Sequence, residues 1–121
     1  MPNILIVDDT DACRRPLARL LTRAGYETAC AGDGREGLNA LEAATPGLIL
    51  LDLDMPVMDG LTFLAAIRAD PRWVSLPVIV FSGEAQRTLA RAKELGADEA
   101  LPKGGPGLRM LLAAIRRHLA V

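Results

Sequence analysis

The stretch Leu48–Gly60, with the sequence LILLDLDMPVMDG, decides how the chain is interpreted. Its first four residues form a continuous apolar run, which is typical of a strand covered on both faces in a parallel sheet. The run stops at Asp52, and a loop with Pro56 and Gly60 follows. Asp52 therefore stands at the carboxyl end of a predicted strand, where open α/β sheets bind ligands. Alone, this position does not distinguish a turn residue from a nucleophile or a metal ligand.

Four further segments predict short strands, at Ile4–Val7, Tyr26–Cys30, Pro77–Phe81 and Glu99–Leu101. Apolar residues at helical spacing predict helices over 11–24, about 35–44, from Leu61 to the Asp70-Pro71 turn, about 85–95, and from Leu108 to Leu119. Because Pro16 lacks a backbone donor, we expect the first helix to start late or to kink. Strand and helix alternate five times, which predicts a doubly wound α/β fold: a five-stranded parallel sheet in the order 2-1-3-4-5 with five helices.

Composition limits what the chain can do. Its 121 residues are about one domain, and a net charge of -1 creates no overall field to attract nucleic acid or a membrane surface. No apolar run approaches the roughly twenty residues that span a bilayer, and Met1–Asn3 lacks the basic start of a signal peptide. We therefore expect a cytoplasmic protein that contacts neither nucleic acid nor a membrane directly.

Acidic residues follow two strands that this sheet order makes neighbours. Asp8 and Asp9 end the first strand and Asp52 ends the third, so all three belong to one crevice. Carboxylates this close repel one another unless a cation binds. Oxygen ligands of this kind suit Mg²⁺, which we therefore predict as the cofactor.

Two polar side chains follow the remaining strands at the same edge. Ser82 ends the fourth strand and Lys103 follows the fifth, and only two of the 14 basic residues are lysines. Taken singly, Ser82 suits a helix N-cap and Lys103 a solvated loop. Together with a carboxylate and a divalent cation, a hydroxyl and an ammonium are what a transferring phosphoryl group needs. Asp52 would then be the nucleophile that forms an aspartyl phosphate.

In their order and spacing, these residues resemble the receiver domain of two-component response regulators, with its flavodoxin/CheY-like fold, from Asn3 to about Leu119. The matching positions are Asp8-Asp9 after the first strand, Asp52–Gly60 after the third, Ser82 after the fourth and Lys103 after the fifth.

The resemblance implies a role for each matching residue. Asp52 would accept a phosphoryl group from a phosphohistidine on a histidine kinase or a histidine phosphotransfer protein of a phosphorelay. Asp9 and Asp52 would bind Mg²⁺ with the backbone carbonyl of Asp54, and Asp8 would act through water. Ser82 and Lys103 would contact the phosphoryl oxygens. Such a domain is not an enzyme in the usual sense, because it catalyses only its own phosphorylation and dephosphorylation.

Three positions depart from the family pattern and are expected to modulate the site. Gly104 follows the lysine where receivers usually have proline, so we expect Lys103 to be looser or displaced without ligand. Ala100 replaces the usual aromatic of the fifth strand, which places the usual relay from Ser82 in question. Asp54 lies two residues beyond the nucleophile, and its charge is expected to tune the Mg²⁺ affinity and the lifetime of the phosphate.

Two other functions fit parts of the pattern. Asp52-Leu53-Asp54 after an apolar strand also resembles the catalytic pair of haloacid-dehalogenase-type phosphatases, although Asp8 and Asp9 then have no role. The substitutions at Ala100 and Gly104 also suit an interaction module that has the fold but switches without phosphate.

We expect residues 1–121 to form a single receiver domain with no output domain, signalling to a downstream protein by contact. On the resemblance, the contact surface is the fourth helix, the fifth strand and the fifth helix. The fourth helix has few apolar residues, which favours movement or partner binding.

Overall fold

The computed structural model of the chain describes residues 3–119 and contains a parallel sheet in the order β2-β1-β3-β4-β5. The predicted fold class and strand order are confirmed. The two residues at each end of the predicted 1–121 domain lie outside the described residues, and the absence of an output domain stays a prediction. The strands are β1 (Asn3–Val7), β2 (Glu27–Ala31), β3 (Leu48–Leu51), β4 (Val78–Ser82) and β5 (Glu99–Pro102).

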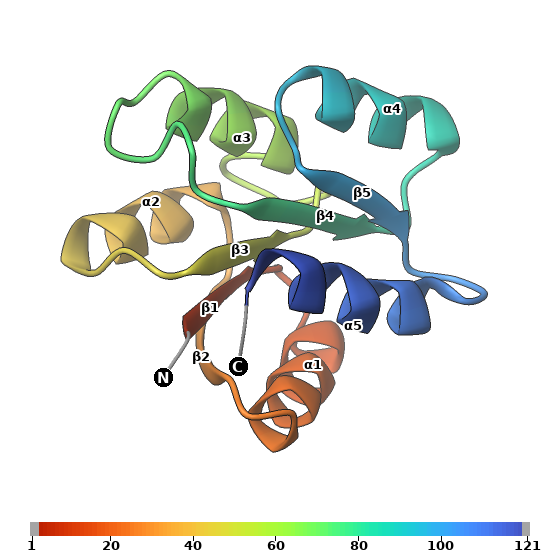
Figure 1. Ribbon diagram of the computed structural model, residues 1–121. Coiled ribbons are helices and arrows are strands. Elements are labelled where there is room, and N and C mark those ends of the chain that lie inside the picture. Colours follow the sequence, from red (N-terminus) through yellow and green to blue (C-terminus); the bar gives the residue numbers. More distant parts are fainter. Residues whose placement is uncertain (1–2, 120–121) are drawn as a thin grey trace.

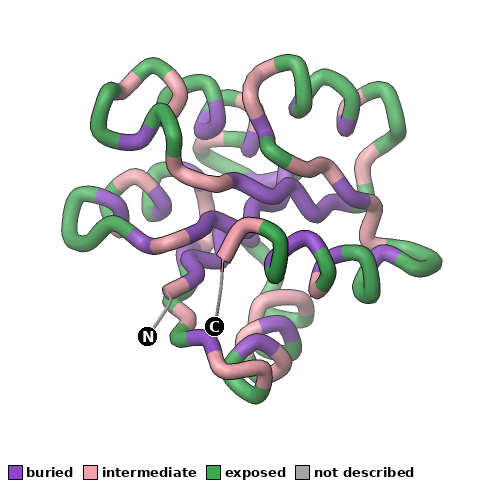
Figure 2. Tube along the Cα trace, viewed as in Figure 1, coloured by how far each residue is buried: buried purple, intermediate pink, exposed green. Residues whose placement is uncertain are grey.

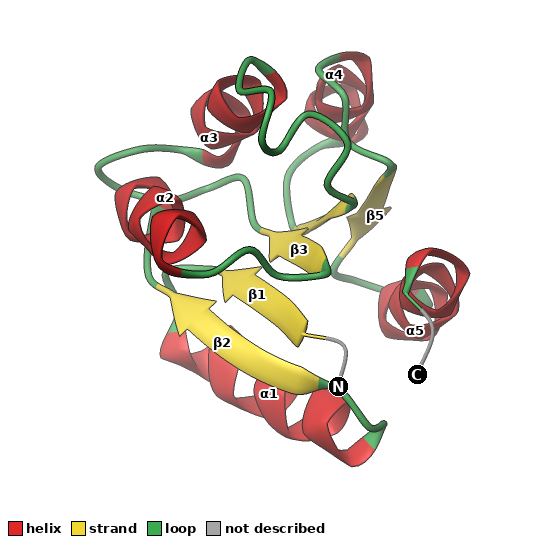
Figure 3. Ribbon diagram, turned by 60° about the vertical axis from the view of Figure 1, so that its left-hand side comes forward, coloured by secondary structure: helices red, strands yellow, loops and turns green. Residues whose placement is uncertain are grey.

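Helices cover both faces of the sheet: α1 and α5 pack on one face, and α2, α3 and α4 on the other (Figures 1 and 3). They are α1 (Asp11–Arg23), α2 (Gly34–Ala43), α3 (Gly60–Arg68), α4 (Gln86–Glu94) and α5 (Gly107–His118). The first helix does not start late, because α1 begins at Asp11 with Pro16 inside it. The other expected effect of Pro16, a kink, stays a prediction. Buried Leu17 and Leu21 hold the helix on the sheet despite the missing bond. None of the described helices is long and apolar enough to cross a bilayer.

The central strands are buried along their whole length, as Figure 2 shows. Every residue of β3 and β4 is buried because helices cover both faces, whereas β2 lies at the edge and is largely exposed. Two hydrophobic clusters result, one under α1 and α5 and the other under α2, α3 and α4. The sheet is therefore a rigid platform for whatever follows its strands.

Strand register brings the carboxyl ends of four strands to one edge. Val7 pairs with Leu51, and Ser82 pairs with Pro102. Gly60 fixes the loop that follows β3: its N–H donates to the carbonyl of Leu53 at 3.0 Å, and a Cβ there would lie only 2.3 Å from the carbonyl oxygen of Asp52. The loop can close in this way only around a glycine.

Arg68, at the end of α3, ties three segments together at the opposite edge of the sheet. Its guanidinium donates to the carbonyls of Gly96, Trp73, Val74 and Leu76 at 2.8–3.1 Å. It also pairs with Asp98 at 3.2 Å, and the same carboxylate oxygen accepts the N–H of Val78 at 2.8 Å. The start of β4, the connection from α3 to β4 and the connection from α4 to β5 thus share one cation.

Replacing this cation should destabilise the fold. Arg68→Met leaves several carbonyls and Asp98 without their donors, and we expect a loss of about 2–4 kcal/mol in the free energy of unfolding. Urea denaturation measures the loss. Arg87→Met, at an exposed position on α4, is the matched control and should change stability by less than about 0.5 kcal/mol. Equal stabilities of the two variants would contradict the role of Arg68.

Candidate functional site

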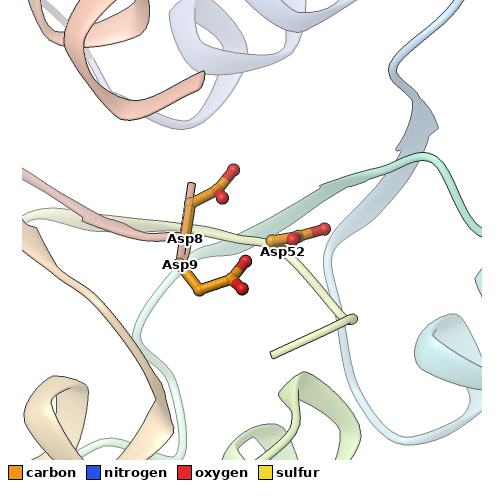
Figure 4. Close-up of side chains that lie close together, drawn as sticks. All are labelled: Asp8, Asp9 and Asp52. Atoms are coloured by element: carbon orange, nitrogen blue, oxygen red, sulfur yellow. The ribbon is translucent and has the colours of Figure 1, made fainter. Parts of the chain in front are cut away.

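Three carboxylates meet at the carboxyl edge of the sheet, as predicted (Figure 4). Asp8 and Asp9 follow β1, and Asp52 follows β3. One carboxylate oxygen of each lies within 4.8 Å of the other two. Asp8 is 3 % exposed and Asp52 is 6 % exposed, whereas Asp9 faces solvent. Strand pairing brings the carboxylates together, because the N–H of Asp52 donates to the carbonyl of Val7, the residue before Asp8, at 2.9 Å.

Asp8 is held by its backbone and by its carboxylate. Its N–H donates to the carbonyl of Ala31 at 3.0 Å, and Oδ1 accepts the N–H of Thr10 at 3.0 Å. Oδ2 accepts a hydrogen bond from Nζ of Lys103 at 2.9 Å. Both oxygens of the buried carboxylate therefore have donors, which a buried charge requires. The carboxylate oxygens of Asp9 and Asp52 are more available to a ligand.

Lys103 lies over the acidic cluster. Besides Asp8, its Nζ lies 3.7 Å from Oδ1 of Asp52, and its N–H donates to the carbonyl of Ser82 at 3.1 Å. Lys103 is therefore not displaced, because two ion pairs and a backbone bond hold it. The alternative expectation from Gly104, a looser lysine, stays a prediction. Burial by itself lowers the pKa of Lys103, but its hydrogen bond with Asp8 and the charges of Asp52 and Asp8 outweigh this and raise the pKa. The side chain stays an ammonium.

Ser82 ends β4 and is 1 % exposed. Its Oγ accepts the N–H of Glu84 at 3.3 Å, whereas the N-cap of α4 is Ala85. Ser82 is thus not a helix cap, and its hydroxyl lines the same pocket as the acids. That pocket has a volume of about 470 Å³ and is lined by Asp9, Thr10, Asp52, Asp54, Ser82, Gly83, Glu84 and Lys103.

Burial raises the pKa of Asp52. The neighbouring Lys103 favours the charged carboxylate and Asp8 opposes it, but the net shift is upward. A cation beside Asp52 would favour the charged carboxylate, which is the form that a nucleophile needs. Clustered carboxylate oxygens beside an open pocket fit a hard divalent ion, because such an ion offsets their repulsion and keeps positions for other ligands. The residues present therefore fit Mg²⁺.

The three positions expected to modulate the site have different surroundings. Asp54 is exposed at its rim. Ala100 is half-buried on β5 against the core under α4. A Cβ at Gly104 would meet nothing within 4 Å, so the loop after Lys103 has room for a larger residue.

The backbone of Val57, in the loop after Asp52, is strained. Its φ is 66°, which is unfavourable for a β-branched residue, and its side chain is 82 % exposed.

Sequence reasoning missed several residues around the acids. Thr10 supplies two donors, one to Asp8 and one, from its hydroxyl, to Asp9 at 3.3 Å. Glu84 lines the pocket, and Arg14 contacts the backbone of Asp8 at 2.7 Å. The place of Thr10 directly after the acid pair could have indicated its role. No sequence spacing predicts that Arg14 reaches back to a carbonyl.

Comparison with known proteins gives one consistent family. The sequence profile of the response regulator receiver domain matches residues 4–116. A probable chemotaxis protein CheY of Rhizobium etli is 36 % identical over 83 % of this chain and 79 % of that protein. The structure of the response regulator TrrA of Thermotoga maritima, solved with Mg²⁺-BeF, is similar with a TM-score of 0.86 and 26 % identity, covering 98 % of this chain and all of that one.

Some relatives are longer proteins in which only one region is similar to this chain. A protein-glutamate methylesterase/protein-glutamine glutaminase of Anaeromyxobacter dehalogenans is 38 % identical over 98 % of this chain. The chain spans only 34 % of that relative's length.

Asp52→Asn should stabilise the metal-free protein at neutral pH. Folding raises the pKa of Asp52, so the buried charge penalises the native state in full above that pKa. The penalty fades as the pH falls through the native pKa towards the usual carboxylate range, because the native state then takes up a proton. Urea denaturation in EDTA at a series of pH values should show an advantage of the variant that shrinks on acidification.

The exposed Asp54 provides the control for this experiment. Asp54→Asn makes the same chemical change at the rim of the pocket, where water solvates the carboxylate, and should leave the stability nearly unchanged. An advantage of Asp52→Asn that is independent of pH would show that the buried charge is not its source.

Proposed function

The chain belongs to the response regulator receiver family, and from this premise we propose that Asp52 accepts a phosphoryl group from a phosphohistidine partner. The observation that supports the proposal most is the convergence of three strand ends on one pocket. These ends supply a buried carboxylate, an ammonium within 3.7 Å of it and a buried hydroxyl. A receiver needs these groups together, and a structural turn needs none of them.

Asp52 would attack phosphorus with a carboxylate oxygen. The new O–P bond forms as the N–P bond of the donor breaks, and the electron pair of that bond returns to the imidazole nitrogen. Lys103 can follow the transferred group without moving far, since it already lies between Asp8 and Asp52. The Ser82 hydroxyl can donate to a phosphoryl oxygen, because its Oγ only accepts in the contact with the N–H of Glu84 and the hydroxyl hydrogen is not used there. Both groups act on charge that gathers on the phosphoryl oxygens.

Asp9, Asp52 and the backbone carbonyl of Asp54 are the groups proposed to hold Mg²⁺, with Asp8 acting through water. When bound, the ion supplies positive charge that offsets the carboxylates and the phosphoryl oxygens. Asp9 suits direct contact because its carboxylate is exposed and bonds only weakly to Thr10.

We also propose the partners and the place of action. The donor is a histidine kinase or a histidine phosphotransfer protein, the domain works in the cytoplasm, and a downstream protein reads it by contact with α4, β5 and α5. Only Leu89 and Ala92 of α4 are buried, so that helix is weakly anchored and able to move. Because Ala100 provides no aromatic ring on β5, we propose that a change at Ser82 moves α4 through the connection between them.

A phosphatase of the haloacid-dehalogenase type is not favoured. Asp8 and Asp9, which that mechanism leaves unused, lie in the cluster with Asp52. A phosphate-independent module is the second candidate, and the departures at Ala100 and Gly104 are what favour it.

Intact-protein mass decides between the receiver function and the phosphate-independent module. Incubation with Mg²⁺ and acetyl phosphate should add one phosphoryl group, about 80 Da, because acetyl phosphate is itself an acyl phosphate donor. Asp52→Asn and a sample in EDTA should gain none. Labelling that survives Asp52→Asn would contradict the assignment of the acceptor, and no labelling of the wild type would favour the phosphate-independent module.

Asp54→Asn tests the proposed tuning of the site. Removal of one charge from the rim should weaken Mg²⁺ binding by about threefold, a size typical of exposed charge interactions. It should also lengthen the life of the phosphate, because the carboxylate lies where water approaches. Calorimetric titration with MgCl₂ and the decay of the phosphorylated mass measure the two effects. Glu94→Gln, which removes an exposed charge of α4 away from the pocket, should change neither. An Asp54→Asn protein like the wild type in both would remove Asp54 from the mechanism.

A further inference from the structure

Arg14 lies on α1 beside the acidic cluster, outside the pocket that Lys103 and Ser82 line. Its Nη1 donates to the backbone carbonyl of Asp8 at 2.7 Å, and its Nη2 pairs with the carboxylate of Asp11. The side chain is 21 % exposed, far less than the neighbouring Arg15 at 76 %. Arg14 therefore makes specific contacts to the loop after β1.

These contacts complete the fixation of Asp8. Its N–H, both carboxylate oxygens and its carbonyl all have partners, and Arg14 supplies the one for the carbonyl. The carbonyl belongs to the peptide group between Asp8 and Asp9. Because a peptide group is planar, holding its oxygen fixes the direction in which the chain enters Asp9.

Asp9 depends on this backbone anchor more than its two acidic neighbours do. Its side chain is exposed, and within residues 3–119 its carboxylate accepts a hydrogen bond only from the hydroxyl of Thr10, at the long distance of 3.3 Å. Repulsion from Asp8 and Asp52 favours a rotation of the Asp9 side chain towards solvent. The direction of the backbone then limits how far the carboxylate can leave the cluster.

The guanidinium is also confined on its other side. A Cβ at Gly32, which follows β2, would lie 3.3 Å from Nη1 of Arg14. Arg14, Gly32 and Asp9 line a second hollow of about 400 Å³ with Cys30, Glu36 and Pro56. The side chain thus lies between the loops after β1 and after β2. A planar guanidinium contacts Asp8 and Asp11 at once, which the single ammonium of a lysine cannot do in the same geometry.

We propose that Arg14 is a positioning residue of the metal site: by holding the carbonyl of Asp8, it keeps the carboxylate of Asp9 poised beside that of Asp52. This inference rests on the proposed function of the pocket as a Mg²⁺ site. It adds a residue that touches neither the ion nor the phosphoryl group.

Charge and position predict opposite effects when Arg14 is replaced. By Coulomb's law alone, removing a cation from beside a cluster of acids strengthens the binding of Mg²⁺. Loss of the anchor weakens it, because Asp9 leaves its ligating position. Replacing residues that orient metal ligands typically lowers affinity by tenfold or more, so we expect the positional effect to prevail in R14Q.

Calorimetric titration with MgCl₂ measures the difference directly. The Kd of R14Q should rise about tenfold, and R14K should fall between R14Q and the wild type. R15Q removes the same charge from the same helix. It also removes the ion pair in which Arg15 lies 3.8 Å from Asp11, and it leaves the contact between Arg14 and Asp8 in place. Its Kd should be unchanged or slightly lower.

Labelling by acetyl phosphate at a series of Mg²⁺ concentrations separates positioning from a general loss of structure. R14Q should need about tenfold more Mg²⁺ for half-maximal labelling and should reach the wild-type rate at saturation. A rate that stays low at saturating Mg²⁺ would overturn the positioning role. If R14Q does not fold, R14K decides the matter: a Kd equal to that of the wild type would overturn the proposal.

The wild-type titration separates the two levels of inference. A wild type that does not bind Mg²⁺ would overturn the proposed function and this inference with it. A wild type that binds, with R14Q binding equally well or more tightly, would overturn the role of Arg14 alone.

Discussion

Mutual repulsion of three carboxylates is the constraint on which this structure depends. Strand pairing places Asp8, Asp9 and Asp52 at one edge, and two of them are almost fully buried. Such a cluster weakens the native state unless other groups offset the charge. Burial of its carboxylate is the chief cause of the raised pKa of Asp52, and the charge of Asp8 adds to the shift. A fold that keeps this arrangement retains it for chemistry, since packing alone would be better served by apolar side chains.

The chain offsets the repulsion with a shell of donors. Lys103 supplies a cation to Asp8 and Asp52, Thr10 supplies an N–H and a hydroxyl, and Arg14 fixes the backbone. Asp9, the acid with the fewest partners, faces the open pocket. The shell therefore satisfies the buried groups and leaves the exposed acid available, which is the arrangement that a cation site requires.

Two departures from the family pattern, Gly104 and Ala100, lie in or just after β5, which is part of the proposed contact surface. Gly104 leaves the loop after Lys103 open, yet the ion pairs hold the lysine in place. Ala100 provides no ring to rotate on β5, whereas Ser82 is joined to the start of the connection to α4 through Glu84. Ser82 therefore belongs both to the proposed chemistry and to the proposed transmission to α4, whereas Ala100 bears on the transmission alone.

The sequence by itself determined the alternation of strands and helices, because apolar periodicity is a local property. It also determined the strand order and which side chains meet, because the carboxyl ends of neighbouring parallel strands lie at one edge of the sheet. These side chains are Asp8, Asp9, Asp52, Ser82 and Lys103. Only the tertiary structure decided that Lys103 stays over the acids despite Gly104, that α1 begins at Asp11 despite Pro16, and that Arg14 reaches the carbonyl of Asp8. These outcomes depend on ion pairs, burial and side-chain reach between segments that are distant along the chain or turned towards each other by folding. No local pattern encodes such contacts, because their energies exist only once the segments have been brought together.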